Sequence, residues 1–203
     1  MIPLIPTLKI KSVTRLGLEA ALKPYFKKVE PGVVLDVGAK NYPYKKYIPF
    51  TKYLTLDLNK SCNPNIICDL HNVGWKSDYF DVVIATEIIE HLYDPQLAIN
   101  EIYRILKRNG ICILSTRFIY RYHRDPGDYY RFTWDSLNYL FRKYSYVEIT
   151  HHGNRIQVLW ELVNSGKLGK VIRVFLNVLN PLVARIRVKK TMYPCGFVVF
   201  AKK

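Results

Sequence analysis

Acidic side chains stand at the ends of successive apolar stretches of the sequence. Asp36, Asp57 and Asp69 each end or follow a short run rich in Val, Ile or Leu, and Glu87 follows a fourth run. A buried carboxylate is costly unless a hydrogen-bond donor or a cation compensates it. A ligand that carries an ammonium group and ribose hydroxyls would supply such partners. We therefore predict that these acidic residues surround a nucleoside-like ligand.

The turn after the first apolar stretch narrows the kind of ligand. It reads Gly38-Ala39-Lys40-Asn41-Tyr42-Pro43 and contains one glycine, whereas a G-x-G-x-x-G turn uses its glycines to approach a pyrophosphate. The phosphate-binding pattern G-x-x-x-x-G-K-[ST] occurs nowhere in the chain. The sequence thus favours a ligand with adenosine and ribose but without phosphates. Asp57, about twenty residues past this turn, is placed to accept hydrogen bonds from the ribose hydroxyls.

The apolar stretches predict strands that alternate with helices. The expected strands are 33–37, 53–57, 66–69, 80–85, 111–116, 146–151 and 196–201. The expected helices are a basic one at about 12–28, an amphipathic one over 95–107 that Asn109-Gly110 stops, and one over 134–143 that Thr133 caps. This pattern predicts an α/β fold: a Rossmann-like, doubly wound, mostly parallel seven-stranded sheet with helices on both faces. Such sheets bind ligands at the carboxyl ends of their strands.

Length and charge suggest one domain with a basic flank. The 203 residues are 49% hydrophobic, which is enough for one sizeable core. Within this single domain, 1–203, we expect a basic helix in 1–30, a cofactor-binding half over 31–117 and a substrate-side half over 118–203. The net charge is +15, and residues 151–203 hold ten Lys/Arg against Glu161 alone. A polyanion is the expected partner: nucleic acid, phospholipid or a phosphate-bearing substrate.

The cysteines and the N-terminus bear on the cellular setting. Cys62, Cys68, Cys112 and Cys195 form no CxxC pair, so we expect reduced, mostly buried thiols rather than a metal site or disulfides. The N-terminal sequence lacks a cationic start and a small-residue cleavage site, and no apolar run is long enough to span a membrane. We therefore expect a cytoplasmic protein.

The ordered motifs resemble those of a known enzyme class. The segments Val34–Gly38, Tyr53–Asp57, Cys68–Leu70, Phe80–Pro95 and Leu106–Ile111 look like the successive motifs of class I S-adenosylmethionine-dependent methyltransferases, in their type 11-like form. The resemblance implies an enzyme of the EC 2.1.1 class that uses S-adenosyl-L-methionine and releases S-adenosyl-L-homocysteine. Lys40 and Asn41 depart from the family, which usually has glycines near these positions.

The resemblance also assigns cofactor-binding residues. It implies that Asp36 and Gly38 frame the methionine end, that Asp57 binds the ribose and that Asp69 lies by the adenine amino group. Glu87 would border the reaction side. The full expected set is Asp36, Gly38, Ala39, Lys40, Asp57, Leu58, Asp69, Leu70 and Glu87.

A narrower resemblance points to the acceptor. The segments Gly38–Lys45 and His123–Thr133 look like methyltransferases that accompany cell-surface glycan biosynthesis. An alcohol acceptor benefits from a base near the incoming oxygen, and the expected catalytic residues are His123, Asp128 and Arg131. Alternatively, Asp128 and Arg131 form an internal salt bridge that holds a lid loop, and His91 simply hydrogen-bonds the start of a helix.

A metal site is a further alternative. Glu87, Glu90 and His91 have helical spacing, and with a distant histidine such as His123 they resemble the magnesium ligands of small-RNA ribose methyltransferases. The segment around His123 looks more like the glycan group, so we predict no metal.

Three functions remain open from the sequence. The first is O-methylation of a sugar or lipid-linked glycan, with a glycan or phosphate-bearing small molecule as substrate. The second is RNA methylation, which the interleaved basic and aromatic residues of 117–131 would suit. The third is a non-catalytic module that kept the fold. Residues 166–190 combine a broad apolar surface, typical of a packed helix, with a basic end that would also suit an anionic membrane.

Overall fold

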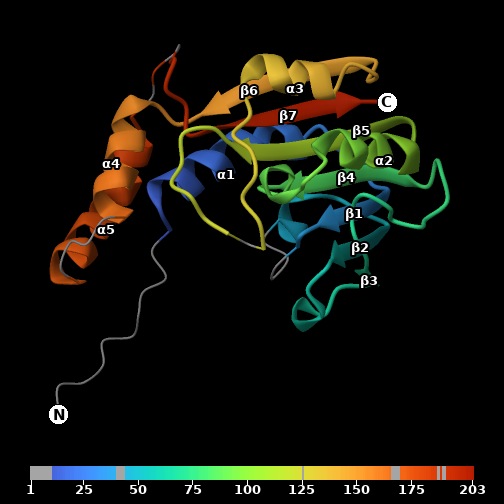
Figure 1. Ribbon diagram of the computed structural model, residues 1–203, viewed down its shortest axis with the longest axis horizontal. Coiled ribbons are helices and arrows are strands. Elements are labelled where there is room, and N and C mark those ends of the chain that lie inside the picture. Colours follow the sequence, from blue (N-terminus) through green and yellow to red (C-terminus); the bar gives the residue numbers. More distant parts are fainter. Residues whose placement is uncertain (1–10, 40–43, 125, 166–169, 187, 189–190) are drawn as a thin grey trace.

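The computed structural model describes residues 11–39, 44–124, 126–165, 170–186, 188 and 191–203. Seven strands in this part of the chain form one sheet with the order β3-β2-β1-β4-β5-β7-β6 (Figure 1). The strands are β1 (Val33–Val37), β2 (Lys52–Asp57), β3 (Ile66–Ile67), β4 (Phe80–Thr86), β5 (Leu106–Arg117), β6 (Tyr146–His152) and β7 (Gly196–Lys202). Only β7 runs antiparallel to its neighbours β5 and β6. The predicted fold class is confirmed.

Helices cover both faces of the sheet. Helix α1 (Val13–Phe26) packs Leu18, Leu22 and Phe26 against the face that carries Val34, Val82 and Ile113. Helices α2 (Pro95–Ile105) and α3 (Trp134–Leu140) lie on the opposite face, as Figure 1 shows, and join the larger core. The alternation of side chains along β1 separates the two cores, because Val34 faces α1 while Leu35 and Val37 face α2.

Local signals explain where the helices start. The Ser12 hydroxyl accepts the Arg15 amide at 3.2 Å and caps α1. Asp94 caps α2 and is followed by Pro95 in the first turn. Thr133 caps α3 in a reciprocal pair with Ser136, as predicted.

Several predicted boundaries are wrong. Helix α2 ends at Ile105 rather than Lys107, because Leu106 is extended and pairs with Phe80 of β4. Strand β3 ends at Ile67, which leaves Asp69 in the following turn. Helix α3 ends at Leu140 rather than at 143.

Two helices precede the last strand. Helices α4 (Arg155–Ser165) and α5 (Lys170–Ala184) pack against α1 and against each other at one end of the molecule (Figure 1). The sequence predicts a packed helix in the region of α5, whereas α4 was not predicted.

Two further findings concern the cellular setting. Among the described residues, no helix combines the length and apolarity needed to cross a membrane. All four cysteines are free, but Cys112 and Cys195 are buried while Cys62 and Cys68 are half-buried. The cytoplasmic location stays a prediction.

Candidate active site

A cavity of about 590 Å³ opens at the carboxyl ends of β1, β2, β4 and β5. This volume is within the range of small-molecule sites. Its wall includes the turn after β1, the ends of β2 and β4, and the loop after β5. The lining residues are Arg15, Gly38, Asp57, Leu58, Asn59, Thr86, Glu87, Ile88, His91, Arg117, Tyr120, His123 and Pro126. Five of them belong to the predicted site: Gly38, Asp57, Leu58, Glu87 and His123.

Gly38 forms the floor between β1 and the β4 loop. Its φ is +66°, a left-handed conformation, and its amide donates to the Leu56 carbonyl at 2.7 Å. A Cβ at this position would overlap the Ile88 Cδ1 atom. Glycine is thus required here for two reasons, the backbone angle and the close approach of Ile88. Ala39 is buried beside it, and Lys40 lies outside the described residues.

We expect Gly38→Ala to destabilise the protein more than Gly74→Ala does. Both glycines have nearly the same positive φ, +66° and +64°, but a Cβ at Gly74 would meet nothing within 4 Å. The left-handed backbone costs each alanine about 1 kcal/mol, and only Gly38→Ala must also displace Ile88. Urea unfolding of both variants measures the difference, and equal losses of stability would contradict the proposed packing against Ile88.

Asp57 is the acidic residue that reaches the cavity from β2. Its Oδ1 accepts the Asn59 amide at 2.9 Å, which fixes the carboxylate at the wall beside the exposed Leu58. This is the position at which the sequence predicts a ribose-binding carboxylate. The predicted ribose contact itself stays a prediction.

The other two strand-end acids do not line the cavity. Asp36 is buried on the α1 face of β1, where the Tyr53 hydroxyl donates to its Oδ2 at 2.6 Å, and burial raises its pKa to about 6. Asp69 is engaged by His71, whose backbone amide and Nδ1 contact Oδ1 at 2.9 and 2.5 Å. Leu70 is buried in the larger core. None of these three residues is therefore part of the cavity wall, and their predicted contacts with the cofactor stay predictions.

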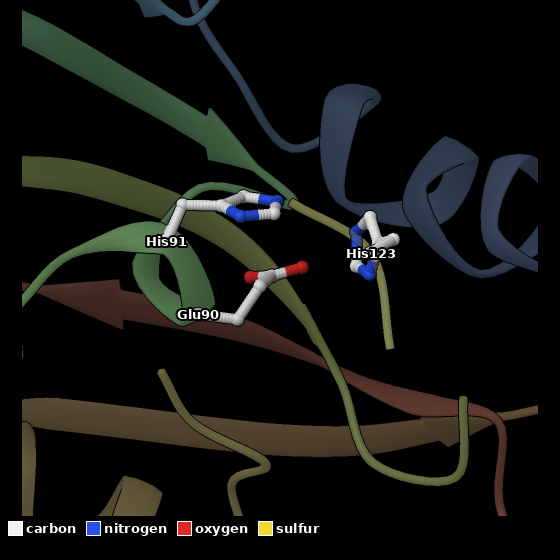
Figure 2. Close-up of side chains that lie close together, drawn as sticks. All are labelled: Glu90, His91 and His123. Carbon is white, nitrogen blue, oxygen red and sulfur yellow. The ribbon is translucent and has the colours of Figure 1, made fainter. Parts of the chain in front are cut away.

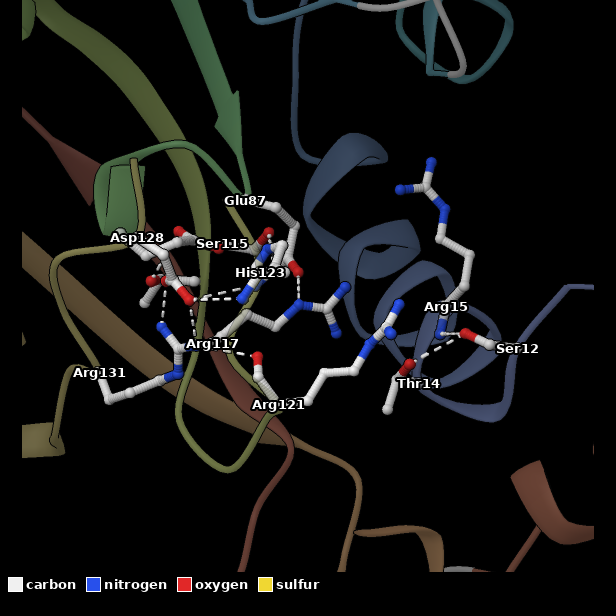
Figure 3. A network of polar contacts seen from close by, with 12 residues as sticks. Ser12, Thr14, Arg15, Glu87, Ser115, Arg117, Arg121, His123, Asp128 and Arg131 are labelled. Carbon is white, nitrogen blue, oxygen red and sulfur yellow. Dashed lines mark hydrogen bonds and ion pairs between the residues drawn. The ribbon is translucent and has the colours of Figure 1, made fainter. Parts of the chain in front are cut away.

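Glu87 and Arg117 form an ion pair at the ends of β4 and β5. Glu87 has a φ of +59°, which is unusual for a residue with a side chain. Its backbone amide donates to the Ser115 carbonyl at 2.9 Å, and the Ser115 hydroxyl donates to its Oε1 at 3.0 Å. Arg117 Nε pairs with the Glu87 carboxylate, and its guanidinium lies 4.2 Å from the centre of the Tyr120 ring. Figure 3 shows this pair beside Arg15 and Arg121.

Arg117 keeps one donor for a ligand. Its side chain is nearly buried, and Nη1 has no hydrogen-bond partner among the described residues. Because Arg117 lines the cavity together with Arg15, an anionic group in the cavity would satisfy this donor.

Glu90, His91 and His123 lie close together (Figure 2), and the two histidines line the cavity. One ligand atom from each lies within 4.8 Å of the others, so the three could hold a divalent cation. This set differs from the sequence-based alternative, because Glu87 turns to Ser115 and Arg117 instead. Glu90 is fully buried, and Thr116 donates to its Oε2 at 2.9 Å while Oε1 lacks a partner among the described residues. Burial, and then the charge of Glu87, raise the Glu90 pKa to about 8.

Asp128 and Arg131 build the loop that follows His123. Arg131 donates to both oxygens of Asp128, at 2.5 and 2.8 Å, and the same carboxylate accepts the His123 amide at 2.7 Å. The hydrogen bond from Arg131 holds the Asp128 pKa at about 2. Neither residue lines the cavity. The internal salt bridge that the sequence left as an alternative is present.

The loop is also tied to the helical turn at Ile89–His91. The Tyr129 amide donates to the Glu90 carbonyl at 2.8 Å, and His91 Nδ1 contacts the Gly127 carbonyl. The contact of His91 is therefore with the loop rather than with a helix start.

Arg15, His91, Arg117 and Tyr120 line the cavity but were not in the predicted set of site residues. The sequence could have indicated Arg117, because it directly follows the apolar stretch at 111–116 and therefore stands at a strand end. Nothing in the sequence pattern places Arg15 here, because it belongs to α1 and arrives through packing across the sheet.

A second cavity, of about 420 Å³, lies between α1, β6 and α4. On its wall, Lys28 and Tyr25 both donate to the Glu148 carboxylate, at 3.1 and 3.0 Å. Both ring nitrogens of the buried His152, on the same wall, have no hydrogen-bond partner among the described residues. It contains none of the predicted site residues.

Part of the chain matches a known protein family. Residues 49–114, which run from before β2 to the middle of β5, match a family model described as a methyltransferase domain, Methyltransf_11. None of the curated proteins matches the chain significantly.

Solved structures show the same fold. A SAM-dependent methyltransferase from Archaeoglobus fulgidus has a TM-score of 0.60 and 19% identity, with 92% of this chain and 93% of that chain covered. A SAM-dependent methyltransferase from Thermotoga maritima has a TM-score of 0.61 and 13% identity, with 94% and 91% covered. Phosphoethanolamine N-methyltransferase 2 of Haemonchus contortus, in complex with S-adenosyl-L-methionine, has a TM-score of 0.57 and 14% identity; 91% of this chain but only 51% of that chain is covered.

The described part of the chain therefore has the fold of SAM-dependent methyltransferases. Its central segment matches a methyltransferase domain, as the sequence motifs led us to expect. The narrower resemblance to the glycan-associated group stays a prediction.

Proposed function

We propose that the protein is an S-adenosylmethionine-dependent O-methyltransferase whose acceptor is a sugar or lipid-linked glycan that carries a phosphate or similar anionic group. The fold and the methyltransferase-domain match support the reaction class. The cavity at the strand ends supports the location, and the buried Arg117 supports the acceptor class.

The residues around the cavity fit the methyl donor. Asp57 presents a carboxylate at the β2 end for the ribose, and Gly38 leaves the floor open where a side chain would not fit. The donor supplies a methyl group already activated by its sulfonium, so the protein must mainly position the acceptor. Glu87 and its neighbours border the side of the cavity at which the acceptor would enter.

Arg117 is the observation that carries the acceptor class. A guanidinium nitrogen that is buried without a partner is costly, and a bound anion would remove that cost. Glu87 neutralises part of the charge through Nε, while Nη1 remains for the ligand and Arg15 adds a second positive charge to the wall. A neutral sugar could offer this donor only hydroxyl oxygens, which make weaker hydrogen bonds with a guanidinium than an anion does.

His123 is the residue best placed to receive the acceptor proton. It lines the cavity, and its Nδ1 lies 3.6 Å from Asp128 Oδ2, beyond hydrogen-bond distance. Burial and the neighbouring His91 lower the His123 pKa, so the ring is neutral at pH 7 and can act as a base. We assign positioning roles to Asp128 and Arg131, because their charges satisfy each other and they hold the His123 backbone.

The test begins with calorimetry of S-adenosylmethionine binding to the intact protein. Bound protein is then offered phosphorylated sugars, their unphosphorylated counterparts, a lipid-linked sugar phosphate and RNA, and S-adenosylhomocysteine release is measured. We expect turnover with the phosphorylated sugars. Turnover with RNA alone would favour the RNA alternative, and failure to bind the methyl donor would favour a non-catalytic module.

We expect Arg117→Met to raise the KM for the phosphorylated acceptor by roughly 10- to 100-fold, because the variant loses one charge-assisted hydrogen bond to the acceptor. The S-adenosylmethionine affinity should stay within about twofold of that of the unmodified protein. Arg108→Met is the matched control, because Arg108 is exposed and lies at the far end of β5. An unchanged KM in a folded Arg117→Met protein would contradict the anion-binding role.

A further inference from the structure

Helices α4 and α5 place polar side chains between them. Trp160 Nε1 donates to Asn180 Oδ1 at 2.8 Å, and Asn164 donates to Asn177 at 2.6 Å. Gln157 donates to the Val183 and Ala184 carbonyls, both at 3.1 Å. Gln157 and Asn180 are buried. The contact between these two helices is therefore rich in satisfied polar groups.

Several of the exposed side chains described in the same helices are apolar. Leu159 and Val163 of α4 are 61% and 57% exposed, and Val178 and Leu182 of α5 are 61% and 60% exposed. Each pair is spaced by four residues, so its members lie on one side of their helix. Val158 of α4 is buried, as is usual, but these four apolar side chains face water. In a typical surface helix the apolar stripe faces the protein and the polar face is exposed.

Cations flank this apolar surface. Arg155 at the start of α4 and Arg185 directly after α5 are both exposed. The sequence from 151 to 203 has ten Lys/Arg and only Glu161 as an acid. Beyond α5, Met192 is 86% exposed and Tyr193 is 55% exposed. Exposed apolar side chains beside basic ones are the combination that binds the interface of anionic lipids.

We propose that the α4–α5 hairpin docks on the surface of an anionic phospholipid membrane. Leu159, Val163, Val178 and Leu182 enter the boundary between headgroups and acyl chains, and the flanking arginines meet the lipid phosphates. No described helix can span the bilayer, so the attachment is to one leaflet. Helix α1 connects this surface to the cavity, because Arg15 of α1 lines the cavity while α4 and α5 pack against α1.

Vesicle flotation with the full chain tests this proposal. We expect the protein to float with vesicles that contain phosphatidylserine and to remain free with phosphatidylcholine alone. The double variant Leu159→Glu/Leu182→Glu should bind the anionic vesicles at least tenfold more weakly, because two apolar side chains no longer leave water. Leu97→Glu is the control: Leu97 is 43% exposed on α2, on the other face of the sheet, and binding should be unchanged.

Three outcomes would overturn the proposal. One is absence of flotation at both low and physiological salt. Another is flotation that the double variant retains, which would place binding on other basic surfaces. The third is light scattering that shows a dimer which the double variant abolishes, which would assign the surface to a second copy. We expect the melting temperature and the S-adenosylmethionine affinity of the double variant to match those of the unmodified protein, which would establish that the variant is folded. Neither measurement depends on whether the protein transfers a methyl group.

Discussion

Asp57→Ala is expected to weaken S-adenosylmethionine binding by at least about 100-fold. A carboxylate that accepts hydrogen bonds from two ribose hydroxyls contributes roughly 1.5–3 kcal/mol for each bond, and the alanine variant loses both. The Asn59 amide, which now donates to Asp57 Oδ1, also loses its acceptor. Isothermal titration calorimetry of the variant and the unmodified protein measures the change.

Asp78→Ala is the matched control for this experiment. Asp78 is an exposed carboxylate that pairs with Lys203 at 2.8 Å, and it precedes β4 at the opposite edge of the sheet from the cavity. Its removal should leave the dissociation constant unchanged. If Asp57→Ala also binds within twofold of the unmodified protein, the assignment of Asp57 to the ribose is wrong.

Glu90→Gln is expected to stabilise the protein increasingly as pH rises from about 5 to 8. The folded-state pKa of Glu90 is raised to about 8 by burial and by Glu87, against an ordinary value of 4.5. Between these two values the unfolded chain releases the proton that the folded protein retains, so stability falls as pH rises. The slope for one such group is about 1.4 kcal/mol per pH unit. Glutamine has no proton to lose and escapes this penalty.

Urea unfolding of both proteins at several pH values measures this difference. The solutions contain a chelator, so that no divalent cation binds between Glu90, His91 and His123 and displaces the proton of Glu90. Glu101→Gln is the control, because the hydrogen bond from Arg104 lowers the Glu101 pKa. Its effect on stability should therefore be constant from pH 6 to 8. A constant difference for Glu90→Gln as well would mean that Glu90 is ionised when folded.

The sequence predicts much of the fold because its signals are local. A run such as Val33–Val37 is apolar over the length of one strand, and Thr133 with Ser136 caps a helix without distant help. The predicted end of α2 was wrong because pairing with a distant strand determines it. Leu106 continues the apolar pattern of α2, yet it pairs with Phe80 and becomes the first residue of β5. Helix α4 was not predicted because its apolar side chains form no single stripe: Val158 is buried, whereas Leu159 and Val163 are exposed.

The candidate site also combines features that follow from local sequence with features that depend on distant segments. Local patterns in the sequence indicate that carboxylates follow successive strands, that Gly38 begins the first turn and that Asp57 ends the second strand. The packing of distant segments places Asp57 at the cavity, turns Asp36 toward α1 and brings Arg15 to the cavity wall. The reason is geometric. A strand end follows from local apolar runs, but the direction of a side chain and its charged neighbours depend on which distant segments pack against it.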